Sequence, residues 1–224
     1  MLLLAVITVR IGVFGLFHPT HLTVQARPQQ VLLINGTPSH AADIRWNSAP
    51  AQITARDGGP TDFLLSIPGK IERNFRGTLS ITSVGDELIP VITMDREQAI
   101  AAVVAAEYPD GTHIEALKAA AVLARSYYTA SRKRHQKFDF CDTTHCQFHR
   151  SPPSAQHAAS RAVQETAGLT IAYQNQTFAP ALCGKLRRPY THGCQCRSAT
   201  RPLPLLLRRL PRMPAKQPQV DATH

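Results

Sequence analysis

The chain changes character at about residue 95, where short strand-like runs give way to helical patterns. Residues 5 to about 94 hold runs rich in Val, Ile, Leu, Thr and Phe, separated by Gly, Pro, Asn and Asp turns. The runs are VITVRIGVFGLF, HLTVQA, QVLLIN, AQITA, DFLLSI, GTLSITSV and LIPVITM. This order predicts an α+β fold: a β-rich N-terminal half, then two or three helices and a short hairpin.

Capping patterns mark where the helices begin. Asp95 with Gln98 predicts a helix that runs to about Glu107 and ends before a Pro-Asp-Gly turn. Thr112 and Glu115 form a second capping pattern, and the helix after it carries an apolar stripe that a buried helix needs. A third helix over about 154–166 is expected next, followed by a hairpin made of LTIAY and TFAPAL.

The charge is unevenly distributed. Residues 183–224 hold nine Lys/Arg and one acidic residue, whereas residues 1–182 hold 16 Lys/Arg and 14 Asp/Glu. The net charge of +10 therefore belongs mostly to a Pro/Arg-rich tail with six prolines and no usable hydrophobic period. Because the rest is nearly neutral, we expect no nucleic-acid partner.

The N-terminal stretch MLLLAVITVRIGVFGLF is apolar, but it has no basic region before the apolar run and no A-x-A-like cleavage site. Arg10 interrupts it, so it is too short and too polar to cross a bilayer. The pattern predicts a buried strand, with no transmembrane span and no convincing signal peptide. The start reads as clipped, so an export sequence is expected upstream.

Soft ligands and acid–base groups are concentrated in FDFCDTTHCQFHR, residues 138–150. Cys141 and Cys146 suit zinc together with one or two histidines, for which His135, His145 and His149 are the candidates. A disulfide between the two cysteines in an oxidising envelope is a second interpretation, and free buried thiols are a third.

Three segments together carry a resemblance. EYPDGTHIEALKAAAVLARSYY, FDFCDTTHCQ and AVQETAGLTIAYQNQTFAPAL come in the order typical of the stage II sporulation protein D family, which includes the amidase-enhancer proteins. The chain resembles this family over roughly residues 8–182. Ala120 departs from the family, which usually has Gln there. Residues 1–182 are thus expected to form a sporulation stage II protein D-like domain, and 183–224 a separate tail.

The resemblance stops at about Leu182. The family usually continues with a Y-x-A-x-C-G-G-x-T-like segment, whereas this chain reads ALCGKLRRPYTHGCQC. One possible set of codons from Leu182 onward, read one base later, translates as Y-A-A-N-C-G-G-R-T-R. This predicts a frameshift, which would leave the domain incomplete at its C-terminus and make Cys183, Cys194 and Cys196 incidental. A genuine disordered basic tail is the alternative.

The resemblance implies a lytic transglycosylase that cleaves the glycan strands of peptidoglycan, in the cell envelope outside the cytoplasm. Glu107 matches the family's catalytic glutamate and would act as general acid and then base. Such a residue is expected in an apolar setting that keeps it protonated. The alternatives are a non-catalytic cell-wall-binding activator of an N-acetylmuramoyl-L-alanine amidase, or an inactive frameshifted product.

The resemblance also favours one ligand set. Family members with this cysteine pair are similar to zinc-binding proteins, which favours His135, Cys141 and Cys146 as zinc ligands, with His145 as a substitute. Two further polar residues, Arg125 and Gln147, are expected to contact sugar, and a helix-face ion pair is an equal alternative for Arg125.

Overall fold

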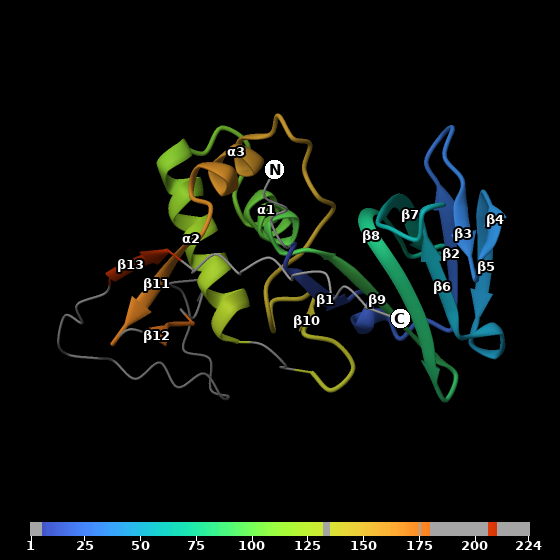
Figure 1. The fold of residues 1–224 in the computed structure, drawn as a ribbon. Helices are drawn as coiled ribbons and strands as arrows, with labels where there is room; N and C mark the ends of the chain where they lie inside the picture. Colours follow the sequence, from blue (N-terminus) through green and yellow to red (C-terminus); the bar gives the residue numbers. More distant parts are fainter. Residues whose placement is uncertain (1–5, 132–134, 175, 180–205, 210–224) are drawn as a thin grey trace, which may run out of the picture.

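The computed structural model describes residues 6–131, 135–174, 176–179 and 206–209. A β-sandwich lies at one side of the molecule and three helices at the other, with β1 and β9 running between them (Figure 1). The strands of this larger sheet system are β1 (Thr8–Gly12), β2 (His21–Ala26), β3 (Leu32–Ile34), β4 (Thr37–Ser39), β5 (Ala41–Arg45), β6 (Ala51–Thr54), β7 (Thr61–Ile67), β8 (Ile71–Val84), β9 (Glu87–Asp95) and β10 (Phe140–Cys141).

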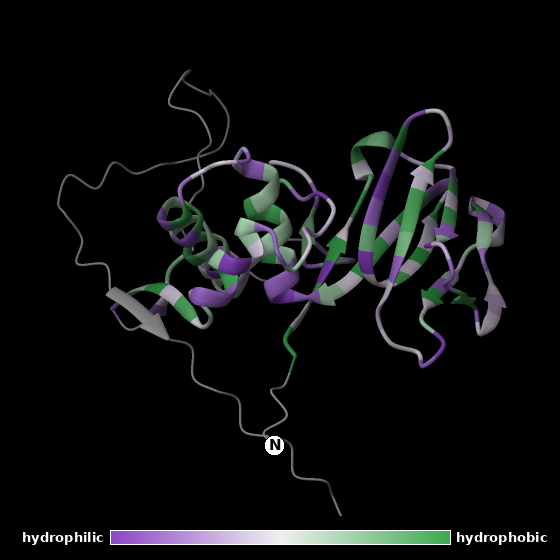
Figure 2. Cartoon of the chain, turned by 90° about the horizontal axis from the view of Figure 1, so that it is seen from above, coloured by the Kyte–Doolittle hydropathy of each residue, from purple (hydrophilic) through white to green (hydrophobic). Residues whose placement is uncertain are grey.

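The long strand β8 belongs to both layers of the sandwich. Its first half pairs with β7, which continues to β2 and β5. Its second half pairs with β9 on one side and β6 on the other, and β6 continues to β3 and β4. Hydrophobic and hydrophilic residues alternate along these strands (Figure 2), as expected when one face of each sheet is buried.

Gly77 lies where β8 passes from one layer to the other. Its φ is +153°, and a Cβ built there would lie 2.5 Å from the carbonyl oxygen of Thr93 on β9. Only glycine fits such a close approach of two backbones. Phe63 and Phe75 then fill the space between the layers, with ring centroids 6.2 Å apart.

Three helices pack against one another beside β1 and β9 (Figure 1): α1 (Arg96–Glu107), α2 (Ile114–Ala130) and α3 (Ala158–Glu165). Asp95 caps α1 by accepting a hydrogen bond from the backbone N–H of Gln98, as predicted. The cap of α2 is His113, whose Nδ1 accepts from the N–H of Glu115. The prediction of Thr112 was wrong by one residue, because its hydroxyl instead donates to the Pro109 carbonyl within the turn.

A small second sheet follows α3. It contains β11 (Leu169–Tyr173), β12 (Gln176–Thr177) and β13 (Leu206–Arg209), with β11 in the centre. The hairpin of β11 and β12 confirms that a hairpin follows α3 and that LTIAY is its first strand. Its second strand is Gln176–Thr177, so it begins one residue before the predicted TFAPAL and ends at Thr177. Strand β13 pairs antiparallel with β11 within the segment expected to be a tail. The predicted frameshift point and the three tail cysteines lie outside the described residues.

The α+β fold class is confirmed, including the β-rich N-terminal half, the helices and the hairpin. Strands β4 and β5 and the first half of β8 were missed, because TPS, AADIR and IERNFR carry Pro or several charges and lack a clean apolar alternation. Within the described residues, no helix combines the length and the apolar character needed to cross a membrane.

Candidate metal centre and acidic site

Four side chains of the segment after α2 converge on one point: His135, Cys141, His145 and Cys146. Each offers one ligand atom, and these atoms all lie within 4.8 Å of one another. Sequence reasoning treated His135 and His145 as alternatives, whereas the fold brings both to the same place. Both cysteines are free thiols, so the disulfide is not formed in this structure.

The donor separations fit a tetrahedral zinc ion. The Nε2 atom of His135 lies 3.3 Å from Sγ of Cys146, and Nδ1 of His145 lies 3.6 Å from the same sulfur and 3.7 Å from Sγ of Cys141. With Zn–S bonds of ~2.3 Å and Zn–N bonds of ~2.0 Å, tetrahedral geometry separates sulfur and nitrogen ligands by roughly 3.5 Å. Two thiols and two imidazoles are also the donor types of structural zinc sites.

Strand β1 positions the cluster. Strand β10 pairs in parallel with β1, with Ile11 opposite Phe140 and Gly12 opposite Cys141. Gly12 leaves room for the ring of Phe138, because a Cβ there would lie 2.5 Å from that ring. The Phe138 ring in turn packs against the His135 imidazole, with centroids 4.5 Å apart. A glycine early in the chain thus sets where a ligand far along the sequence can lie.

Hydrogen bonds from distant residues and within the turn itself fix the backbone between the two cysteines. Asp142 is buried, and its Oδ2 accepts hydrogen bonds from the N–H of Phe14 and from Nη1 of Arg73, each at 3.2 Å. Thr143 bridges the ligands, since its hydroxyl accepts from the N–H of His145 and lies 3.3 Å from Sγ of Cys141. Through these bonds Asp142 and Thr143 fix the turn that carries the ligands.

The two thiols differ in acidity because they share a hydrogen bond. The contact with Cys146, together with hydrogen bonds from Thr143 and His145, lowers the pKa of Cys141 to about 3. The same contact and burial raise the pKa of Cys146. Cys141 is therefore the cysteine that is readily deprotonated, and the thiolate is the form of cysteine that binds metal.

Glu107 is the last residue of α1, and its side chain is exposed. The backbone N–H of Tyr108 bonds to the Val104 carbonyl and closes the helix. The apolar setting expected around this carboxylate is therefore not formed by the described residues. Its neighbours in the following turn are engaged elsewhere: Asp110 lies 3.4 Å from Nε2 of His157 at the start of α3.

Most carboxylates between residues 85 and 173 have a partner in the described structure. Glu87, Glu97, Asp110, Glu115, Asp142 and Glu165 pair with cationic or histidine side chains, and Asp95 and Asp139 accept from backbone N–H groups. Among the described residues, only Asp86 and Glu107 in this range make no such bond. Asp86 lies in the turn between β8 and β9, which leaves Glu107 as the unpaired carboxylate of the helical part.

The same range matches a known family. Residues 85–173 match the family model described as "SpoIID: Stage II sporulation protein". This segment is a SpoIID domain. It runs from the β8–β9 turn to the end of β11, so it contains all three helices, the Cys/His cluster and Glu107. No curated protein matches the chain.

Within the SpoIID domain, the cluster and Glu107 lie toward opposite ends of α2. The turn after Glu107 leads into the start of α2, and the cluster follows its other end (Figure 1). With 17 residues, α2 is ~25 Å long. Along the chain, Glu107 thus precedes the N-terminal end of α2 and the cluster follows its C-terminal end.

Arg125 lies inside the SpoIID domain with 0% of its surface exposed. It donates to the Glu97 carboxylate from Nε and Nη2, at 2.9 and 2.7 Å. It also donates to the carbonyls of Val163 and Leu169 and to the Thr166 hydroxyl. This geometry favours the ion-pair alternative over a sugar contact, because every N–H group is directed at the protein.

Gln147 and His149 are also buried, with 4% and 1% of their surface exposed. Neither the Gln147 amide nor the His149 ring bonds to a group in the described part of the chain. Burial, with a smaller contribution from Arg73, lowers the pKa of His149 to about 4. Gln147 is therefore buried in this structure, and His149 is not among the four clustered ligands.

The SpoIID domain indicates a sporulation-related function at the cell wall, and an extracytoplasmic or sporulation-related location. Sequence reasoning found the cluster and Glu107 through their motifs. It missed that Gly12 and Arg73, both outside the match, position the cluster's segment. Neither residue carries a sequence signal, because their contacts span more than 60 residues.

Proposed function

We propose that the protein cleaves the glycan strands of peptidoglycan as a lytic transglycosylase, with Glu107 as the single general acid and base. The observation that carries the proposal is the unpaired, accessible carboxylate of Glu107 at the end of α1, within the SpoIID domain. A carboxylate that no cation among the described residues neutralises is free to exchange a proton with a bound strand.

In the first step Glu107 protonates the glycosidic oxygen as the bond to the sugar carbon breaks. In the second step the resulting carboxylate accepts the proton of the same sugar's C6 hydroxyl, whose oxygen closes a 1,6-anhydro ring. Water is not the nucleophile, so one carboxylate suffices, in contrast to two-carboxylate hydrolases. A strand laid over the helix end would exclude water from the reacting atoms.

We also propose that His135, Cys141, His145 and Cys146 hold Zn²⁺. Bound zinc would cross-link the segment after α2 and so supply folding free energy rather than a reacting group. The separations between the donors and the thiolate-forming cysteine pair support this assignment.

One observation favours the non-catalytic alternative, a cell-wall-binding activator of an amidase. Glu107 is exposed, whereas a general acid working near neutral pH needs a desolvated setting. The two functions differ in whether the carboxylate is needed for bond cleavage.

The test incubates two purified proteins with stem-peptide-free glycan strands: this chain, and a version with the reading frame restored after Leu182. Mass spectrometry then measures 1,6-anhydro-muramoyl ends. We expect these ends from at least one version, and expect Glu107→Gln to abolish them. Asp86→Asn is the matched control, since it removes the other carboxylate between residues 85 and 173 that has no partner among the described residues. If both folded versions yield no anhydro ends, the enzyme proposal is wrong, and stimulation of a purified amidase becomes the next measurement.

A further inference from the structure

The β-sandwich has a cavity of about 360 Å³ outside the SpoIID domain. Residues of the β2–β3 connection, the end of β6, the start of β7 and the middle of β8 line it. Its volume falls in the lower part of the ~300–1,000 Å³ range of small-molecule sites. Nothing in the proposed cleavage reaction uses it.

A charged pair forms one wall of this cavity. Asp62 on β7 and Arg76 on β8 face each other across the sheet, with Nη1 of Arg76 3.0 Å from Oδ2 of Asp62. The pair is partly exposed, at 34% and 49% of the two side chains. In the described part of the chain Arg76 donates only through Nη1, so its other N–H groups remain available to a ligand.

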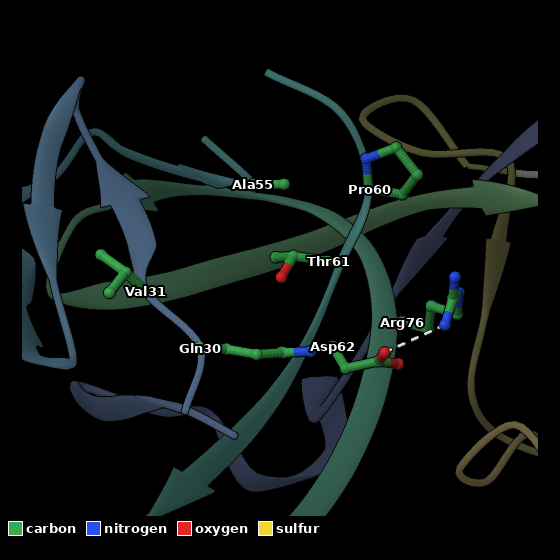
Figure 3. A pocket seen from close by; sticks show the side chains of 7 residues that line it. All are labelled: Gln30, Val31, Ala55, Pro60, Thr61, Asp62 and Arg76. Atoms are coloured by element: carbon green, nitrogen blue, oxygen red, sulfur yellow. Dashed lines mark hydrogen bonds and ion pairs between the residues drawn. The ribbon is translucent and has the colours of Figure 1, made fainter. Parts of the chain in front are cut away.

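Neutral polar groups complete the polar part of the site. Figure 3 shows the Thr61 hydroxyl and the Gln30 amide projecting into the space beside the Asp62–Arg76 pair. Neither side chain bonds to another group among the described residues. The cavity therefore offers a carboxylate, a guanidinium, an amide and a hydroxyl, which can both donate and accept hydrogen bonds.

The remaining lining is apolar and comes from Val31, Ala55 and Pro60. Asp62 and Arg76 are the only charged residues among the seven that line the cavity, and their charges cancel. A free anion would meet the Asp62 carboxylate and a free cation would meet the Arg76 guanidinium. The site thus suits a neutral ligand that carries several hydroxyl or amide groups and an apolar face.

We propose that this cavity is a second glycan-binding site, which takes a neutral N-acetylated sugar unit. The hydroxyls and the amide of such a sugar match Asp62, Arg76, Thr61 and Gln30, and its methyl group and ring C–H groups match the apolar wall. The identity of the natural ligand, a peptidoglycan strand, rests on the proposed function. The site would hold a strand at the sandwich while the helical part acts on it.

The test measures binding of N-acetylglucosamine oligomers to the full chain carrying Glu107→Gln, by ¹⁵N NMR titration. Cleavage is thereby removed, so failure of the site and failure of the proposed reaction give different results. We expect backbone shifts at Thr61 and Asp62. We expect Arg76→Ala to weaken binding at least ~10-fold, as loss of hydrogen bonds from a charged group predicts.

Two further variants keep the test decisive. Gln30→Ala changes an exposed side chain, so it should leave the fold intact and still weaken binding. Arg45→Ala, which removes an exposed arginine of β5 outside the cavity, should bind like the parent protein. Unchanged binding by both Arg76→Ala and Gln30→Ala would overturn the proposal. Tighter binding of an anionic stem peptide than of the neutral oligomer would overturn the ligand class.

Discussion

Arg125→Met should destabilise the protein by ~3–5 kcal/mol. Arg125 joins α1, α3 and the start of β11 to α2 through its bonds to Glu97, Val163 and Leu169. Removing it takes one donor from each of two carbonyls, Val163 and Leu169, at ~1–3 kcal/mol for each polar group left unsatisfied. The Glu97 carboxylate adds less, because it is 34% exposed and keeps Arg96 at 3.1 Å. The sum lies in the range for breaking a buried pair, ~3–5 kcal/mol.

Urea unfolding followed by circular dichroism measures this loss, and a parallel melt should show Tm falling by roughly 10 °C. Arg125→Lys should recover only part of the stability, because an ammonium cannot donate in the planar fork that Glu97 and the carbonyls require. Arg76→Met is the matched control, since it breaks a partly exposed pair worth ~1 kcal/mol or less. A loss below ~1 kcal/mol for Arg125→Met would refute the assignment of Arg125 as a central structural residue.

Three further changes have defined outcomes. Lowering the pH from 7 should destabilise the protein, because the folded state depresses the pKa of His149 from 6.5 to about 4 and the unfolded chain takes up the proton first. The loss should develop between pH ~6.5 and ~4, reach at most ~3 kcal/mol, and be absent in His149→Phe when unfolding is measured across this range. Gly77→Ala should cost more than ~2 kcal/mol, whereas Gly15→Ala, whose Cβ would meet nothing within 4 Å, should be well tolerated in the same denaturation assay. A chelator should lower Tm and Cys146→Ser should abolish zinc retention in elemental analysis; full zinc content in this variant would contradict the ligand assignment.

Local patterns predicted the helices well. Asp95 and Gln98 mark the start of α1, and the apolar stripe of α2 follows from the sequence, because capping and periodicity act within a few residues. The cap of α2 was misplaced from His113 to Thr112, since imidazole nitrogen also accepts from a helix N-terminus. The strand IERNFR was missed because its partner β7, rather than its own apolar content, makes it a strand.

The sequence predicted which residues form the candidate site, but not which buried residues hold the surrounding structure in place. Clustered Cys and His residues are visible in the sequence, and the structure brings their ligand atoms to within 4.8 Å of one another. The burial of Arg125 was not visible, because its partners Glu97, Val163 and Leu169 lie 28 to 44 residues away. Which polar residues become internal depends on tertiary packing that no short pattern encodes.

The parallel pairing of β1 with β10 has a consequence for the time course of folding. Ile11 and Gly12 of β1 pair with Phe140 and Cys141 of β10, and the N–H of Arg10 donates to the carboxylate of Asp139 just before β10, 129 residues away. As the chain emerges from the ribosome, β1 can pair with β9 first, but its other edge must wait until residue 141 has been synthesised. Long-range closure of this kind is slow, and an open strand edge recruits other chains meanwhile. Strand β10, within the segment that carries the Cys/His cluster, thus pairs with the free edge of β1 only late in synthesis. Conditions that delay this pairing should favour aggregation of the nascent protein.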